Sequence, residues 1–356
     1  MLLLCILFIT SVWFCIDYPA SLEKNIETGF GVSETKYGLL YTFFAIPNCI
    51  MPLVGGIFFD KLGTRNGLML FSFVVCIGQG LLMLGGYQMS FNTLLIGRIV
   101  FGIGCEAMIV GQSAIASAWF MNFELSFAMS VIVCFPMLGS FMQGALIPTV
   151  YERTEDFGWV FAIGFIMCLG SFLISILMAI MDSKTEKADN RLLDEYALKK
   201  KEAAGIRISG RKSSAFGGDN VSSYSEAIKE HFDWNDLTQF PKQFWYTCIS
   251  CCLMQIAINN FLVIGSAVLQ TRYGWTEIQA GYLFPMPYVF AAFLSPILGK
   301  IIDKYGFRNQ FSIIGSFCMI TAHAMQLFMP DCEEGCAISI VPLFLLGVSY
   351  CTYAVA

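Results

Sequence analysis

The sequence has little charge and almost no histidine. Only 13% of its 356 residues are Asp, Glu, Lys or Arg, about half the share of a typical soluble domain, and only two are His. It offers no Ser-His-Asp set, metal-ligand pattern or nucleotide-binding loop, so it predicts neither an enzyme nor a metal or cofactor site. Hydrophobic residues, by contrast, make up 56% of the chain and include 33 Phe. One water-soluble core cannot bury that excess, which predicts an all-α polytopic membrane protein.

Apolar runs of about 20 residues, the length that crosses a bilayer as a helix, recur along the chain. We expect ten spans, at residues 1–17, 37–59, 68–87, 93–117, 125–148, 158–181, 244–269, 281–301, 311–329 and 338–356. No basic segment precedes the first run, which favours a transmembrane helix over a cleaved signal peptide. The first and last runs are cut short, so we expect a fragment or a truncated gene model.

A polar segment at 182–242 interrupts this pattern and separates six spans from four. Its serine-rich later part is typical of a flexible linker, and its beginning could form a short surface helix. We therefore expect a six-helix lobe over 1–181, a cytosolic linker over 182–242 and an incomplete second lobe over 243–356.

Basic residues are distributed unevenly between the two faces. If the loop after the second span is cytosolic, sixteen Lys and Arg fall on the cytosolic side and four on the other, as the positive-inside rule predicts. Eleven of the sixteen belong to the 182–242 segment, so the orientation depends partly on the repeat described next.

Two eleven-residue blocks, 56–66 and 299–309, share Gly, Asp, Lys, Gly, Arg and Asn in register. Each block joins two apolar spans on the same face, which indicates a parallel repeat of six-helix halves. We expect the first glycine to allow close helix approach, the second a tight turn, and the carboxylate to cap the N-terminus of the next helix.

The basic residues of the blocks could pair with that carboxylate or with a facing helix. Such contacts would form a latch that holds one face shut and breaks when the halves move, whereas the simpler alternative is a loop that only sets topology. The predicted gating and structural residues of the blocks are Gly56, Asp60, Lys61, Gly63, Arg65, Gly299, Asp303, Lys304, Gly306 and Arg308.

The blocks resemble the signature loop of the major facilitator superfamily, which lies between helices 2 and 3 and is echoed between helices 8 and 9. Arg98, Gly102 and Gly104 are similar to the Arg-x-x-x-Gly-x-Gly signature of its helix 4. The resemblance implies twelve helices in two lobes and transport by alternating access. Against this family pattern we expect helices 11 and 12 and part of helix 10 to be missing from the chain, so that the first-lobe latch would lack its helix 11 contact.

Residues 14–20, 39–41, 47–48, 100–106 and 346–350 resemble one branch of this superfamily, the lysosomal dipeptide transporters. The resemblance implies uniport of dipeptides or amino-acid-like solutes from lumen to cytosol, a lysosomal membrane location and a glycosylated accessory subunit. Whether the protein forms a homodimer is left open, and a location in the plasma membrane or another endomembrane is an alternative. The branch has an Arg in helix 5 for the substrate carboxylate. Met137 aligns with that Arg, so another cation serves or the substrate differs.

Two ionisable side chains, Arg98 and Glu106, lie well inside a span, where each costs about 2.5–3.5 kcal/mol. On an ideal helix they are about 80° and about 12 Å apart, so each needs its own partner. Glu106 could bind an ammonium group or carry a proton, and the resemblance implies a contact with the peptide amino end. The alternative is a neutral acid bonded to a neighbouring helix. For Arg98, an anchor within the lobe and a substrate or proton-relay contact stay equally open.

Four polar residues inside spans and one aspartate at the end of the first span are weaker candidates for the substrate site. The alternative for the four is a polar contact between helices, and the alternative for the aspartate is a helix end in water. Two other functions stay open, namely a carrier of sugars or organic anions coupled to protons through Glu106, and a truncated protein that transports nothing. Cys332 and Cys336 could form a disulfide in an oxidising lumen. The weaker substrate-binding candidates are Asp17, Tyr41, Asn259, Asn260 and Tyr350.

Overall fold

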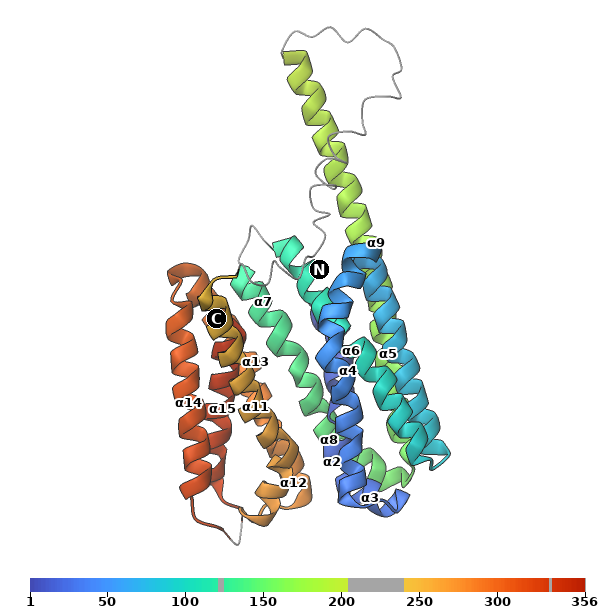
Figure 1. Cartoon of the computed structure of the whole chain (residues 1–356), viewed down its shortest axis with the longest axis vertical. Coiled ribbons are helices and arrows are strands. Elements are labelled where there is room, and N and C mark those ends of the chain that lie inside the picture. Colours follow the sequence, from blue (N-terminus) through green and yellow to red (C-terminus); the bar gives the residue numbers. More distant parts are fainter. Residues whose placement is uncertain (121–124, 204–239, 333–334, 356) are drawn as a thin grey trace. The chain divides into compact units, whose positions relative to one another are not determined.

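The structure is a computed structural model that describes residues 1–120, 125–203, 240–332 and 335–355. Within these ranges it leaves out the side chains of 189–190, 193–203, 259–260, 262–263, 277–278, 308 and 354–355. All regular elements in the described ranges are helices (Figure 1). Seven helical segments there are long and apolar enough to cross a bilayer. The all-α polytopic membrane architecture expected from the sequence is therefore confirmed.

The first half of the chain carries the predicted first six spans. Two short helices, α2 and α3, intervene between its first two long helices. The elements are α1 (Leu2–Ile16), α2 (Tyr18–Ser21), α3 (Glu23–Phe30), α4 (Glu34–Leu62), α5 (Thr64–Tyr87), α6 (Phe91–Phe120), α7 (Leu125–Cys134), α8 (Leu138–Thr154) and α9 (Phe157–Ala203).

The second half carries helices at the four remaining predicted spans. Its elements are α11 (Lys242–Thr271), α12 (Glu277–Leu283), α13 (Met286–Tyr305), α14 (Arg308–Phe328) and α15 (Ile340–Val355). Helices α1 and α15 are apolar but shorter than the seven long segments. Helix α11 covers the expected span 244–269, although it is not among the seven.

Two expected spans are interrupted rather than continuous. The span predicted at 125–148 is split by a 3-10 turn, η1 (Phe135–Met137), between α7 and α8. The span predicted at 281–301 breaks between α12 and α13, where Pro285 precedes the new helix. Pro136 and Pro285 have no N–H to donate to the preceding turn, which explains both interruptions.

Helix α9 extends beyond its apolar part. The polar residues from Asp182 to Ala203 continue the same helix, where the sequence suggested a separate short surface helix. Residues 171–203 contain neither Gly nor Pro, so no local signal ends the helix at the membrane boundary.

The chain divides into two compact units. One comprises Met1–Met181 together with Met254–Ala356, and the other comprises Asp182–Leu253. All the site residues below belong to the first unit. The division into lobe, linker and lobe stays a prediction.

Helices α5 and α6 lie against each other through glycines within the first unit. A Cβ on Gly78 would lie 2.4 Å from the backbone nitrogen of Phe101, and one on Gly97 would lie 2.9 Å from that of Leu82. Only residues without a side chain allow this approach. The contact holds α6, which carries Arg98 and Glu106, firmly against its neighbour.

Candidate functional site

Arg98 ties helix α6 to the end of helix α1. The side chain is 2% exposed. Its guanidinium donates to the carbonyl oxygen of Cys15 at 3.3 Å and to that of Ile16 through both terminal nitrogens at 3.2 Å. It also lies 5.8 Å from the ring centroid of Phe44 on α4. A cation on the last carbonyls of a helix is favourable, and this geometry fits the anchor alternative better than a substrate contact.

Asp17 and Tyr41 lie near Arg98 and extend this polar cluster. Asp17 follows α1 directly, and its carboxylate is close to the Ser140 hydroxyl of α8 and to the Arg98 guanidinium. One of its oxygens is buried without a hydrogen-bond partner in the described part of the chain. The Tyr41 hydroxyl lies 3.5 Å from that of Tyr37, one turn earlier on α4. The structure thus brings two predicted substrate residues together with Arg98.

Glu106 lies two turns along α6 from Arg98 and is half-buried. Among the described residues it has no hydrogen-bond partner, in contrast to Arg98. Tyr350 of α15, which belongs to the second half of the chain, lies within electrostatic reach of Glu106.

Two aromatic residues that the sequence analysis did not select complete this region. Tyr288 of α13 is 4% exposed, and its ring centroid lies 6.1 Å from that of Tyr350 and 5.8 Å from that of Trp13 on α1. Trp13 and Tyr288 meet edge to face, so they join the first half to the second. Residue type alone could not have identified Trp13 and Tyr288, because aromatic residues are common throughout the spans.

Met137 is 1% exposed in the turn η1 and packs in the same apolar cluster as Tyr288 and Tyr350. This position, where the resemblance implies an Arg, is therefore an apolar wall of the region. Asn259 and Asn260 belong to helix α11, but their side chains lie outside the described residues.

The second signature block makes a contact between the two halves. Asp303, near the end of α13, accepts hydrogen bonds from the backbone N–H of Ser126 at 3.1 Å and of Phe127 at 2.9 Å. These groups begin α7, so the carboxylate caps a helix of the first half. The sequence suggested capping of the next helix along the chain, which is α14, and that detail is wrong. A carboxylate at a helix N-terminus is favourable wherever the helix comes from.

Gly299 and Lys300 add to the contact between α13 and α7. A Cβ on Gly299 would lie 2.6 Å from Oγ of Ser130 and 2.8 Å from Cα of Phe127, so the expected close approach is present. The ammonium of Lys300 lies 5.0 Å from the ring centroid of Phe127. Lys304 instead lies over the ring of its neighbour Tyr305, and the side chain of Arg308 is outside the described residues.

The first signature block lacks a matching contact. A Cβ on Gly56 would meet nothing within 4 Å, so the close approach predicted for this glycine is wrong. It is the preceding Gly55 that faces another helix, with the Ala107 Cβ at 3.1 Å, because one residue turns a helix by about 100°. Asp60 and Lys61 are exposed and have no hydrogen-bond partner in the described ranges.

Both blocks form the turn that their second glycine predicts. Gly63 and Gly306 end α4 and α13 with φ of 81° and 87°, a region that residues with a Cβ rarely occupy. Arg65 lies in the first turn of α5, where it is half-buried and interacts with a neighbour.

Cys332 and Cys336 form the predicted disulfide in the loop after α14. The loop is held to the end of α11, because the Cys332 N–H donates to the Arg272 carbonyl at 2.9 Å. The Arg272 side chain in turn pairs with Asp331 at 2.7 Å.

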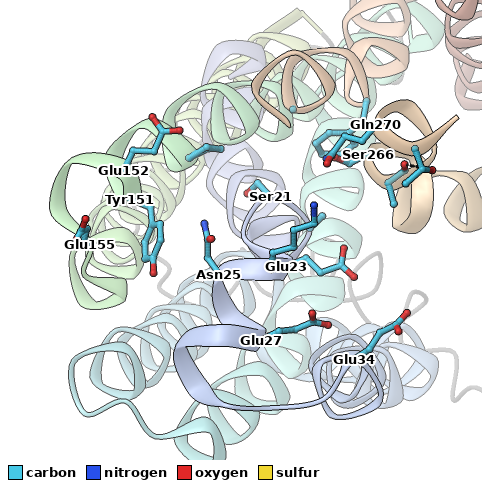
Figure 2. Close-up of a pocket in the computed structure, with 17 residues that line it drawn as sticks. Ser21, Glu23, Asn25, Glu27, Glu34, Tyr151, Glu152, Glu155, Ser266 and Gln270 are labelled. Atoms are coloured by element: carbon cyan, nitrogen blue, oxygen red, sulfur yellow. Dashed lines mark hydrogen bonds between the residues drawn. The ribbon is translucent and has the colours of Figure 1, made fainter. Parts of the chain in front are cut away.

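A cavity of about 480 Å³ lies among α3, α8, α11 and α12 (Figure 2). None of the predicted substrate residues lines it. Its lining is acidic and comes from both halves of the chain.

Comparisons with known proteins agree with this architecture. The model of the Major Facilitator Superfamily matches residues 2–356. The human Lysosomal dipeptide transporter MFSD1 is 28% identical over all of this chain and 70% of its own length, and the zebrafish (Danio rerio) protein of that name is 26% identical over 97% and 68%. A crystal structure of the peptide transporter POT with sulfate superposes with a TM-score of 0.62 at 12% identity, covering 98% of this chain and 80% of the other. Tetrameric PepTSo2 superposes with a TM-score of 0.57 at 13% identity, covering 98% and 81%.

Proposed function

Because the chain belongs to the major facilitator superfamily, we propose that it carries dipeptides or amino-acid-like solutes from the lysosomal lumen to the cytosol by alternating access. As a member of this family it is a membrane transporter for small solutes. The finer statement is supported by the similarity over the whole chain to proteins named as lysosomal dipeptide transporters. The same similarity supports a lysosomal membrane location. Uniport and an accessory subunit in that membrane are further parts of the proposal, which rest on the resemblance of the sequence motifs alone.

The observation that carries the substrate proposal is the Glu106 carboxylate on α6, which is half-buried and has Tyr350 of the second half within electrostatic reach. A half-buried carboxylate without a protein partner in the described chain is costly, and a substrate ammonium group would satisfy it. The phenols of Tyr350 and of its neighbour Tyr288 offer neutral hydrogen bonds from the second half. Because these groups come from both halves, a bound solute would be held where the halves move relative to each other.

Uptake into proteoliposomes tests this proposal. The purified protein should take up labelled dipeptide down its gradient, and an imposed proton gradient should not drive accumulation beyond the dipeptide gradient if it is a uniporter. Glu106→Gln should lower uptake by about 10-fold or more, since hydrogen bonds to a charged group contribute about 1.5–3 kcal/mol. Glu152→Gln, an exposed glutamate on α8, is the matched control and should transport normally.

A competition panel distinguishes the alternatives. Unlabelled dipeptides should compete, whereas sugars and organic anions should not. Competition by sugars or organic anions alone would overturn the dipeptide assignment, and unchanged uptake by Glu106→Gln would remove that residue from the site.

A further inference from the structure

The cavity among α3, α8, α11 and α12 has acids on one side and neutral groups on the other. Five glutamates of the first half line it, whereas the described lining from α11 and α12 carries no ionisable side chain. Figure 2 shows Glu23, Glu27 and Glu34 gathered on one side of the space, with Ser266 and Gln270 across from them. The five acids are Glu23, Glu27, Glu34, Glu152 and Glu155.

The acids differ in how far water reaches them. Glu34, Glu152 and Glu155 are exposed, while Glu23 and Glu27 are half-buried. One carboxylate oxygen of Glu27 is buried and has no hydrogen-bond partner among the described residues. Ionised carboxylates are costly in such a place, and here they are also close to one another.

Charged and titratable groups of α3, α4 and α8 lie around Glu23. Glu27 and Glu34 repel its negative charge, and Lys24, the one cation in the described lining, attracts it. The hydroxyls of Tyr37 and Tyr41 on α4 are also within electrostatic reach, while α8 adds Tyr151 beside its two exposed glutamates. Burial, followed by the repulsion from Glu27 and Glu34, raises the pKa of Glu23 above its ordinary value.

The opposite side can bond a protonated acid. The Gln270 amide nitrogen donates to the Ser266 hydroxyl at 3.2 Å, and the Gln270 carbonyl oxygen can accept a hydrogen bond from across the cavity. A neutral carboxyl could donate to it as the space narrows. An ionised carboxylate has no proton to donate and would lose its water, so it opposes the same closure.

We propose that this cavity is a proton-controlled gate at the face predicted to be luminal, which closes when the Glu23 carboxyl is protonated and opens when it ionises beside the charges of Glu27 and Glu34. Closure removes water from Glu23 and makes its neutral form more favourable, so closing and proton uptake are coupled. Lowering the pH therefore shifts the population towards the closed gate. The effect belongs to the mildly acidic range above the ordinary Glu pKa of about 4.3.

The gate adds pH control to the proposed transport function, and only its effect on transport rests on that function. In an acidic lumen, closure of the gate would favour the conformation of the transporter that is closed to the lumen. The movement itself needs no substrate, so it can be measured whether or not the dipeptide proposal holds.

Distance measurement between two spin labels tests the gate. Thr154→Cys, at the end of α8, and Thr271→Cys, at the end of α11, place labels on the two exposed sides of the cavity. The labels are attached at neutral pH to protein in which the unburied native cysteines are replaced by Ser, namely Cys49, Cys248, Cys251, Cys252 and Cys318.

From about pH 7.5 to about pH 5 the ratio of the short-distance to the long-distance population should rise about tenfold. The triple variant Glu23→Gln, Glu27→Gln, Glu34→Gln should give the short distance at every pH. The control Glu152→Gln, Glu155→Gln, which changes only the exposed acids of α8, should respond to pH like the unmodified protein.

Two results would overturn the gate. One is a distance distribution of the parent protein that does not change with pH, and the other is a triple variant with the parent's pH profile. The single variant Glu23→Gln, which is nearly isosteric, guards against misfolding of the triple variant. It should lower the pH response without changing the thermal unfolding midpoint.

Discussion

The blocks at 56–66 and 299–309 have six residues in common and yet make different contacts. In the second block Asp303 caps α7, and Gly299 lets α13 lie directly against that helix. In the first block Asp60 has no partner in the described chain, and Gly56 faces open space. Both blocks nevertheless end their helix at a glycine with positive φ.

The comparison separates what a motif does locally from what it does in the fold. A glycine after a helix makes a turn wherever it occurs, because the requirement lies in its own backbone. A carboxylate becomes a latch only if a helix N-terminus approaches it from elsewhere. Substitutions at matched positions of the two blocks should therefore have equal effects at the turns and unequal effects at the latch residues.

The largest difference is expected at the first glycine of each block. Gly299→Leu would force α13 away from Ser130 and Phe127, and overpacking of this kind costs about 1–3 kcal/mol. Gly56→Leu meets no atom within 4 Å, and as the better helix former it should be neutral or stabilising by up to about 0.8 kcal/mol. Thermal unfolding in detergent measures both. Equal losses of stability would contradict the comparison.

The latch carboxylates should differ next most. Asp303→Asn removes the charge from two hydrogen bonds to the start of α7 and should destabilise that contact by about 1 kcal/mol. Asp60→Asn should stay within about 0.5 kcal/mol. Unfolding midpoints at low and high salt provide the test, since added salt should reduce the effect at Asp303. An equal shift from Asp60→Asn would show that the first block is engaged as well.

At the turn glycines the two blocks should behave alike. Gly63→Ala and Gly306→Ala both place a Cβ on a backbone with positive φ, at a cost of about 1–2 kcal/mol each. Parallel thermal melts of the two variants should give similar decreases. A large difference between them would mean that the turn is not a local property.

The smallest effect is expected at Lys300, which corresponds to Ile57 in the first block. Lys300→Ile removes the cation from the Phe127 ring and should cost about 0.5–1 kcal/mol. Lys304→Met is the control, because in the described part of the chain that ammonium lies over the ring of its own neighbour Tyr305. If both variants have the same unfolding midpoint as the parent, Lys300 contributes nothing to the contact between the halves.

Much of the fold could be read from the sequence, because spans are set by the length and hydropathy of each run. The interruptions at Phe135–Met137 and before α13 were missed, although Pro136 and Pro285 were visible, because a proline can also be accommodated within a transmembrane helix. Tyr288 and Trp13 were missed for a different reason. Their role depends on which helices of the two halves meet, and residue type does not tell this in a chain with so many aromatics.

The candidate site, too, could be predicted from the sequence only in part. The sequence alone identified Arg98 and Glu106 as ionisable side chains in a span, since a charge in the bilayer is conspicuous wherever it points. Only the tertiary structure distinguished them, by placing the carbonyls at the end of α1 around Arg98 and no protein partner in the described chain beside Glu106. Helices, turns and membrane class follow from local composition. Latches and sites depend on groups far apart in the chain, and only folding brings these together.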